Sequence, residues 1–414
     1  MLIVNQNHRL RTDLAAIEPP LWAGLCASYM DADILDAEAL DLTLDETEVK
    51  IRESGHKEVL IVVMGNNPSV SSTPKMPVSE ALAERLTGIK VSLTGIHPIA
   101  VGSKFLVIEK PFVGFPMMPW DKLPMDKYRA HNWHCLDGSP RAPYASIYTS
   151  MGCPYNCYYC SIHTLYTKRQ VWFRPISHIK KEVELLVKKY NIRNIKIWDE
   201  LFTLKEDRVS AICSIFREYD GANAGANAGA NAGANAGANA LNIWAYARSD
   251  TVTEKMLKEM KRSGINWLAY GFESADIITR KLSNKFFSNE QMLQAIKMTK
   301  DAGINIIGNF MFGLPGETEE TRKETLSFSK EQLFEFVNFY EALPYPGSQW
   351  YNDTKPSLAW NEYDQYKKER MPFRDMAFRE YFTNPDYLSM IGKRFGNQAV
   401  KQIKNMLKEE VKHA

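Results

Sequence analysis

The sequence predicts an α/β protein: a partial (β/α)6 barrel, preceded by a small doubly wound domain and followed by a helical extension. Two observations carry this prediction. Short apolar runs, typical of buried parallel strands, alternate with longer segments of helical spacing over residues 1–100, and the same alternation returns from residue 144 onwards. Between the two series, residues 113–143 are rich in proline and aromatic side chains.

The first series predicts a Rossmann-like domain over residues 1–112. Its strands are expected at residues 1–5, 32–35, 59–64 and 90–95, and its helices at residues 14–30, 42–53 and 79–86. Residues 105–109 then lead into the linker. The run Val59–Met64 is apolar throughout, as expected of a strand buried on both faces of a parallel sheet. It ends in a turn cluster, Gly65–Ser69, at the edge where open α/β sheets bind their ligands.

Residues 113–143 are expected to be a linker that crosses to the mouth of the barrel, because an irregular stretch of this length is usually functional or connecting. Within it, Tyr128–His134 either faces substrate or packs between the domains.

The second series predicts the barrel core over residues 144–345. Its six strands are expected at residues 144–149, 194–198, 242–248, 267–273, 304–312 and 336–343. Ser288 and Gln291 form a capping-box pattern that opens one of the helices, and Gly303 ends it. In such barrels the chemistry lies at the carboxyl ends of the strands.

Two further segments complete the chain. Residues 221–240 are five tandem copies of Gly-Ala-Asn-Ala, expected to be a flexible surface insertion without a catalytic role. Residues 346–414 are expected to be a helical extension that closes the bottom or side of the barrel or leans over substrate. Tyr351, Trp360 and Tyr363 are its candidate packing or substrate-facing side chains.

Composition narrows the class of protein. The formal net charge of +2 argues against a dedicated nucleic-acid surface. No apolar run is long enough for a membrane span, and Met1–Asn5 is too short for a secretory leader, so a cytoplasmic location is expected. The six cysteines are too sparse in 414 residues for a disulfide framework.

The stretch around which the chain is organised contains Cys153, Cys157 and Cys160, spaced C-x3-C-x2-C in a loop after the first barrel strand. Thiolates are the usual protein ligands of iron–sulfur clusters. Three ligands on a [4Fe-4S] cluster leave one iron open, and an open position distinguishes catalytic from structural metal sites. The competing interpretation is a zinc site completed by His163.

This motif after a strand resembles the signature of the radical SAM superfamily. The resemblance implies that the open iron binds the amino and carboxylate groups of S-adenosylmethionine (SAM), which is reductively cleaved to a 5′-deoxyadenosyl radical. It also implies that Tyr159, the aromatic residue before the third cysteine, packs near the adenine.

The same resemblance implies further cofactor-binding residues at the strand ends. Asp199 and Glu200 would face the methionyl amino group, and Arg248 the carboxylate. Glu273 would accept hydrogen bonds from the ribose, and Gly313 would lie beside the adenine. Four of these residues have a structural alternative. Asp199 and Glu200 could cap the next helix, Arg248 could form an ion pair, and Gly313 could only make the turn.

Residues 17–22, 34–38 and 64–74 resemble the cobalamin-binding domain of one branch of that superfamily. The domain looks shortened by comparison, so it either binds cobalamin or is a docking domain without a cofactor. The resemblance implies a cobalamin-dependent methyltransferase that acts on an unactivated carbon of a small molecule, with an external electron donor such as flavodoxin or ferredoxin. A cyclase-type or rearranging radical enzyme and a non-catalytic iron–sulfur protein are the alternatives.

Overall fold

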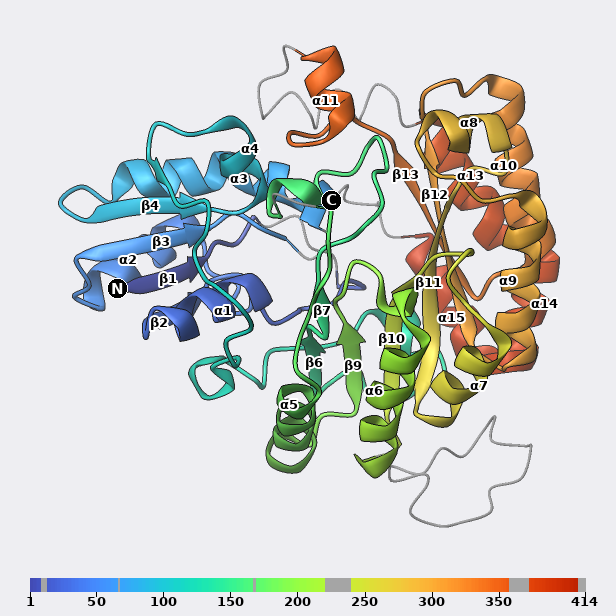
Figure 1. Cartoon of the computed structure of the whole chain (residues 1–414), viewed down its shortest axis with the longest axis horizontal. Coiled ribbons are helices and arrows are strands. Elements are labelled where there is room, and N and C mark those ends of the chain that lie inside the picture. Colours follow the sequence, from blue (N-terminus) through green and yellow to red (C-terminus); the bar gives the residue numbers. More distant parts are fainter. Residues whose placement is uncertain (9–12, 66–67, 167–168, 220–239, 357–371, 409–414) are drawn as a thin grey trace.

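The computed structural model describes residues 1–8, 13–65, 68–166, 169–219, 240–356 and 372–408. Within these ranges the chain forms two parallel sheets that lie side by side, with helices packed around them (Figure 1). This architecture confirms the α/β prediction. Among the described residues, no helix has the length and apolar character that a membrane crossing needs.

The first sheet has five parallel strands in the order β2-β1-β3-β4-β5. The strands are β1 (Leu2–Asn5), β2 (Asp33–Asp36), β3 (Glu58–Val62), β4 (Lys90–Thr94) and β5 (Leu106–Val107). The helices between them are α1 (Leu21–Tyr29), α2 (Leu44–Glu53), α3 (Pro68–Arg85) and α4 (Ile96–Val101). This is a doubly wound order whose switch point lies between β1 and β3.

Two predicted helices of this region were wrong at their starts. The helix expected from residue 14 begins at Leu21, because Ile17 pairs with Arg129 of the linker in an antiparallel bridge. The prolines at 19 and 20 also bias the residues before them away from helical backbone. The helix expected at residues 79–86 is the end of α3, which begins at Pro68. Two prolines lie inside α3, although proline removes a backbone hydrogen bond from a helix interior.

The second sheet has six strands in the order β13-β12-β11-β10-β9-β6, with every neighbouring pair parallel. Its strands are β6 (Tyr144–Ile147), β9 (Asn194–Ile197), β10 (Asn242–Ala247), β11 (Ile265–Glu273), β12 (Asn305–Phe312) and β13 (Phe336–Glu341). All six predicted strands are confirmed. The sheet is open, with β13 and β6 at its edges, as a partial barrel requires.

Helices follow the strands along one side of this sheet (Figure 1). They are α5 (Ile176–Tyr190), α6 (Glu206–Tyr219), α7 (Glu254–Arg262), α8 (Ile277–Leu282), α9 (Asn289–Asp301) and α10 (Glu319–Gln332). The α9 helix carries the predicted capping box between Ser288 and Gln291. A small hairpin of β7 (Ser150–Met151) and β8 (Trp172–Phe173) frames the loop that contains the cysteines.

The linker contains two short 3-10 turns, η1 (Trp120–Lys122) and η2 (Asn132–Cys135). It does not run to the barrel mouth as predicted. Trp133 packs edge-on against Trp244 and Trp267, close to the amino ends of β10 and β11, and the Asn242 side chain donates to the backbone oxygen of His134. Aromatic burial therefore draws residues 132–135 to the base of the sheet, so they pack and do not face the mouth.

A buried ion pair joins the two regions. Glu18 precedes α1, and its carboxylate accepts from the Lys196 ammonium of β9 at 3.0 and 3.1 Å and from the Trp198 indole N–H at 2.9 Å. Burial lowers the pKa of Lys196. The ammonium also lies over the Trp244 and Tyr246 rings, at 4.7 and 5.7 Å from their centroids.

The C-terminal extension covers the β13 edge. Its helices are α11 (Gln349–Thr354), α13 (Pro372–Thr383), α14 (Pro385–Phe395) and α15 (Asn397–Met406). The Tyr381 and Tyr387 hydroxyls donate to the backbone oxygens of Phe334 and Glu335, just before β13. Tyr351 lies in α11, whereas Trp360, Tyr363 and nearly all of the Gly-Ala-Asn-Ala repeat lie outside the described residues.

Candidate functional site: the cysteine loop at the strand ends

The cysteine loop, residues 152–171, leaves the sheet at the carboxyl end of β6. Cys153, Cys157 and Cys160 form no disulfide and are half-buried. Gly152 starts the loop with a φ of +92°, and a Cβ there would collide with the backbone oxygen of Gln170. A glycine is therefore needed at this turn for both its backbone conformation and its small size.

Asp199 fixes the start of this loop. Its carboxylate accepts from the Thr149 backbone N–H at 2.6 Å and from the Thr149 and Ser150 hydroxyls at 2.5 Å each. Burial raises its pKa, and these hydrogen bonds act in the opposite direction. Asp199 thus lies beside the cysteine loop as predicted, but its oxygens hold the protein's own backbone and hydroxyls.

Glu200 has a different set of contacts. One oxygen accepts from the Gly152 N–H at 2.8 Å, and Oε1 is buried without a hydrogen-bond partner among the described residues. Burial raises the pKa of this carboxyl to about 8. The nearby Tyr148 and Tyr166 hydroxyls are likewise buried without a described partner. A buried acceptor left open is a place where a ligand's hydrogen-bond donor would bind.

Arg248 follows β10 and has partners of its own. Its guanidinium makes two hydrogen bonds to Asp250, of 2.9 and 3.0 Å, and stacks 3.7 Å above the Tyr155 ring. The remaining nitrogen, Nη1, lies 3.9 Å from the Cys157 sulfur. The structural alternative, an ion pair, is thus what the structure contains, and the free side of the guanidinium faces a thiol.

Tyr159 and Glu273 meet, although 114 residues separate them. The Tyr159 hydroxyl donates to Glu273 Oε1 at 2.8 Å, and the Lys285 ammonium donates to the same oxygen at 2.6 Å. Glu273 ends β11 with a φ of +65°, which is rare for a residue with a side chain. Lys285 was not predicted, because a single lysine in a short loop carries no sequence motif.

Gly313 ends β12 in a tight turn with a φ of +90°. A Cβ at this position would lie 2.9 Å from a Glu341 side-chain oxygen. The Gly313 backbone N–H donates to Glu317 Oε2 at 2.5 Å. The other Glu317 oxygen is buried without a described partner. The glycine therefore serves the turn and also permits close approach, so both predicted roles are compatible with the structure.

The charges and spacing of the three thiols favour binding of a positively charged metal group that all three share. The pKa of Cys153 is raised to about 12, first because burial disfavours the thiolate and then because Cys160 and Cys157 add negative charge nearby. Bound iron favours the thiolate form and removes this conflict. No three possible ligands among the described residues are gathered tightly enough for a single metal ion, whereas a [4Fe-4S] cluster takes each thiolate on a different iron.

The zinc alternative needs His163 as its fourth ligand. In the structure His163 Nε2 lies 2.6 Å from the backbone oxygen of Tyr155, within the cysteine loop itself. The imidazole therefore braces the loop from one side. A zinc ion would have to displace this contact or use Nδ1.

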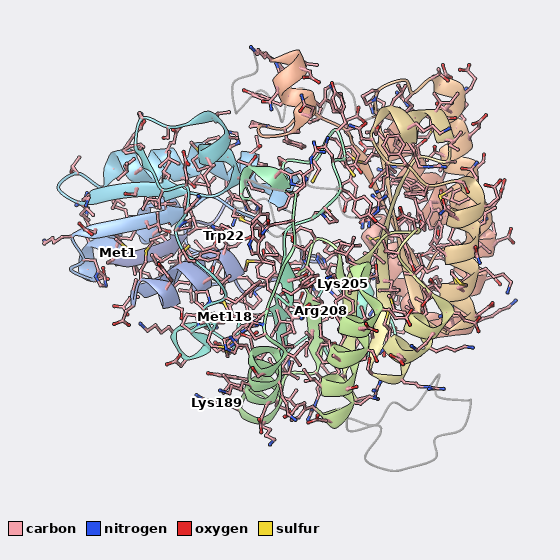
Figure 2. All side chains as sticks on the ribbon, viewed as in Figure 1. Met1, Trp22, Met118, Lys189, Lys205 and Arg208 are labelled. Atoms are coloured by element: carbon pink, nitrogen blue, oxygen red, sulfur yellow. The ribbon has the colours of Figure 1, made fainter. Side chains whose placement is uncertain are left out.

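A narrow crevice, with a volume of about 10 Å³, separates the carboxyl ends of the first sheet from the second sheet. It is lined by Asn5, Pro19, Pro20, Leu21, Trp22, Ala23, Val62, Met64, Gly65 and Trp198. Trp22 lies between the two sheets (Figure 2) and packs on Tyr166 of the cysteine loop, with its indole N–H buried and unpartnered among the described residues. The crevice thus adjoins the cysteine loop.

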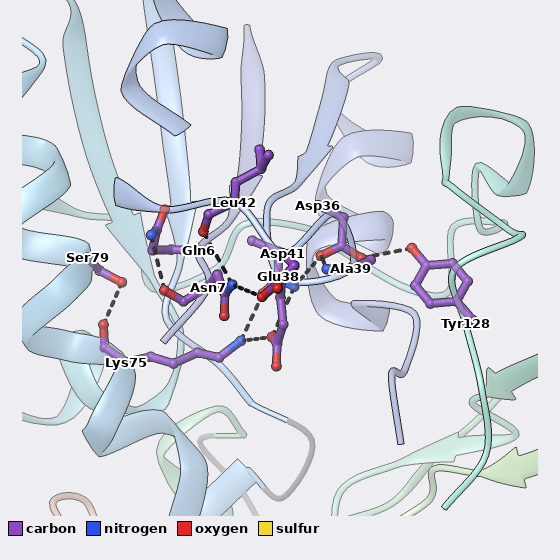
Figure 3. A network of polar contacts seen from close by, with 11 residues as sticks. Gln6, Asn7, Asp36, Glu38, Ala39, Asp41, Leu42, Lys75, Ser79 and Tyr128 are labelled. Atoms are coloured by element: carbon purple, nitrogen blue, oxygen red, sulfur yellow. Dashed lines mark hydrogen bonds and ion pairs between the residues drawn. The ribbon is translucent and has the colours of Figure 1, made fainter. Parts of the chain in front are cut away.

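Next to the crevice the first sheet carries a polar network (Figure 3). The buried Lys75 ammonium donates to Asn5 at 3.0 Å and to Glu38 at 2.5 Å. Asp36 accepts from the Asn5 amide and the Tyr128 hydroxyl, at 2.8 Å each. Burial raises the pKa of Asp36 to about 6. These groups satisfy one another and tie the linker to β2.

Comparison with known proteins places this arrangement in a family. Residues 147–329, which include the three cysteines and strands β9 to β12, match the Radical SAM superfamily. Residues 147–329, somewhat under half of the chain, are thus a region that matches the radical SAM superfamily of enzymes. The prediction from the cysteine motif is therefore confirmed.

Curated relatives of this chain include methyltransferases and a cyclase. An uncharacterized methyltransferase of Pyrococcus horikoshii is 30% identical over 60% of this chain and 49% of the relative. The bacteriochlorophyllide d C-8(2)-methyltransferase of Chlorobaculum tepidum is 27% identical over 56% and 49%. The anaerobic magnesium-protoporphyrin IX monomethyl ester cyclase of Rubrivivax gelatinosus is 24% identical over 52% and 36%. The chain spans about half the length of the first two relatives and 36% of the length of the third.

Solved structures show the same fold. The radical SAM methyltransferase TsrM of Kitasatospora setae, with tryptophan and a SAM analogue bound, has a TM-score of 0.58 at 15% identity, over 84% of this chain and 75% of that chain. The cobalamin-dependent radical SAM enzyme OxsB with aqua-cobalamin bound has a TM-score of 0.55 at 14% identity, over 99% of this chain and 63% of that chain. At these identities the likeness concerns the fold.

Proposed function

We propose that this protein binds a [4Fe-4S] cluster through Cys153, Cys157 and Cys160 and cleaves SAM reductively. One observation supports this most directly: three thiols that form no disulfide lie in one loop, and Glu200, which accepts from the Gly152 N–H of that loop, keeps a buried oxygen without a partner among the described residues. A cluster held by three thiolates supplies an open iron and one electron, which SAM needs to release a 5′-deoxyadenosyl radical.

The protein's own residues would bind and orient SAM. Glu200 Oε1 would accept from the methionyl amino group, and Glu273 from the ribose hydroxyls. The backbone at Gly313 would lie against the adenine. Asp199 and Arg248 act indirectly in this proposal: Asp199 fixes the start of the loop, and Arg248 donates from Nη1 to the Cys157 sulfur.

Methyl transfer to an unactivated carbon of a small molecule is the reaction we propose. The crevice would take cobalamin, which supplies a transferable methyl group when bound. Its proline and tryptophan lining suits the flat face of a corrin, and the unpartnered N–H of Trp22 suits one of the amide side chains of cobalamin. Pockets for drug-sized ligands span roughly 300–1,000 Å³, whereas this crevice holds about 10 Å³, so a corrin requires the two regions to separate widely here.

A second candidate is a radical reaction without methyl transfer, of the cyclase or rearranging type. Two observations favour it. The curated relatives include cyclases, and the last unit of the first sheet is reduced to a six-residue helix and a two-residue strand. In both cases an external carrier such as flavodoxin or ferredoxin would deliver the electron, and the proposed location is the cytoplasm.

The test is an anaerobic product analysis. The protein is reconstituted with iron, sulfide and hydroxocobalamin and treated with SAM and a strong reductant, and the products are measured by mass spectrometry. Deoxyadenosine together with cobalamin-dependent S-adenosylhomocysteine supports the methyltransferase. Deoxyadenosine alone supports the second candidate. Neither product, with an intact cluster, refutes both and favours a non-catalytic iron–sulfur protein.

A further inference from the structure

The loop that follows α8, residues 283–287, packs against the cysteine loop. The Tyr158 backbone N–H donates to the Ser283 backbone oxygen at 3.0 Å. Two residues further on, the buried Lys285 ammonium lies 2.6 Å from Glu273 Oε1 and 3.5 Å from the Tyr159 hydroxyl. One short segment thus contacts the cysteine loop and the end of β11 together.

The two oxygens of Glu273 are not equivalent. Oε1 accepts from Tyr159 and from Lys285, whereas Oε2 has no hydrogen bond among the described residues, and the Glu273 side chain is 9% exposed. A carboxylate held by one oxygen keeps the other available to a ligand. The side chain therefore has a fixed end and an open end.

The backbone of Glu273 needs this support. Its left-handed conformation is unfavourable for a residue with a Cβ, and such conformations persist only where the surroundings hold them. Gly271 leaves room for the arrangement, because a Cβ there would lie 2.5 Å from Glu273 Oε1 and 2.7 Å from the Lys285 nitrogen. The glycine, the acid and the lysine are thus fitted to one another.

Lys285 is itself held in place. Its backbone N–H donates to the Arg280 backbone oxygen at 2.9 Å, and its ammonium lies 5.8 Å from the centre of the Phe287 ring. The buried Arg280 guanidinium donates to the Ser274 backbone oxygen at 2.6 Å, directly after Glu273. The ammonium therefore approaches Glu273 from a braced loop.

We propose that Lys285 is a positioning residue of the SAM site: it anchors Glu273 Oε1 so that Oε2 is presented to a ribose hydroxyl, and it links this acid to the loop that carries the thiols. The inference rests on the SAM-binding part of the proposed function and is independent of cobalamin and methyl transfer.

The test compares Lys285→Met with Lys281→Met, a matched change at an exposed lysine in the last turn of α8, just before this loop. Cluster content is measured from bound iron, SAM affinity by equilibrium dialysis, and SAM binding at the cluster by electron paramagnetic resonance of the reduced protein. We expect Lys285→Met to retain iron and to lose about 10- to 100-fold in SAM affinity, the range seen when supporting partners of ligands are removed. Lys281→Met should match the wild type.

A second ligand separates positioning from general damage. The 2′-deoxyribose analogue of SAM lacks a hydroxyl that Glu273 would bind, so Lys285→Met should weaken it much less than it weakens SAM. Equal loss for both ligands, or no loss for either, overturns the inference. Wild-type protein with a full cluster that binds no SAM refutes the proposed function itself, and the inference with it.

If Lys285→Met does not fold, Lys285→Arg and Tyr159→Phe replace it. Arginine keeps the charge and should retain part of the affinity, whereas phenylalanine removes one of the two donors to Oε1 and should weaken SAM selectively. Unchanged SAM affinity in both of these folded variants overturns the inference.

Discussion

The two parallel sheets of this protein present carboxyl edges of opposite character. At the first edge Asn5, Asp36, Glu38 and Lys75 pair with one another, although the Trp22 N–H beside them has no described partner. At the second edge the three thiols form no disulfide, and Glu200 keeps a buried oxygen without a partner among the described residues. Topology makes both edges possible ligand sites. The difference teaches that unsatisfied groups, more than topology, mark where a ligand is required.

The largest expected effect is at the second edge. Cys157→Ala should abolish cluster binding and all SAM cleavage, because two thiolates cannot replace three on one cluster. Bound iron and deoxyadenosine are measured after reconstitution. Cys213→Ala, a buried free thiol in α6, is the control and should keep both. A full complement of iron in Cys157→Ala would contradict the site.

The next effect concerns the joint between the two regions. Lys196→Met leaves the Glu18 carboxylate buried without its cation, which should reduce the free energy of unfolding by about 3–5 kcal/mol. Chemical denaturation measures this loss. The double variant with Glu18→Gln should recover part of it, and Lys189→Met at an exposed position should change stability by no more than about 0.5 kcal/mol. Equal losses for Lys196→Met and Lys189→Met would refute this role.

Lys75→Met tests the first edge alone. It leaves polar groups of Asn5 and Glu38 without their donor, which should cost about 1–3 kcal/mol in the free energy of unfolding. Deoxyadenosine formation by the folded variant should match the wild type, because this network does not touch the cysteine loop. A large loss of SAM cleavage at unchanged iron content would remove the distinction between the two edges.

The smallest effect is at Glu200. Burial raises its pKa to about 8, and a hydrogen-bond donor on SAM favours the ionised form, so binding releases a proton below that pH. Linkage then makes SAM affinity rise with pH up to about pH 8, by at most about tenfold per unit. Glu200→Gln should lose about tenfold in affinity at pH 8 and show a shallower rise. Equal slopes for the two proteins would exclude this ionisation.

Much of the fold was predictable from local patterns. The six strands of the second sheet were predicted because each is a short, largely apolar run that alternates with a longer segment of helical spacing, a pattern typical of buried parallel strands. The predicted starts of α1 and α3 were wrong, because proline has opposite consequences in the two places. Pro19 and Pro20 precede α1, whereas Pro74 and Pro77 lie inside α3. Only contacts with the linker and neighbouring helices decide such cases.

The sequence by itself determined the cysteine loop, the two sheets and the residues that end the barrel strands, because parallel strands bring their carboxyl ends to one edge whatever lies between them. Only the tertiary structure decided which strand-end groups are already paired, as at Asp199 and Arg248, and which stay open, as at Glu200. It alone brought Lys285 to Glu273 and Lys196 to Glu18. A hydrogen bond or ion pair between distant segments depends on distances that no local pattern contains.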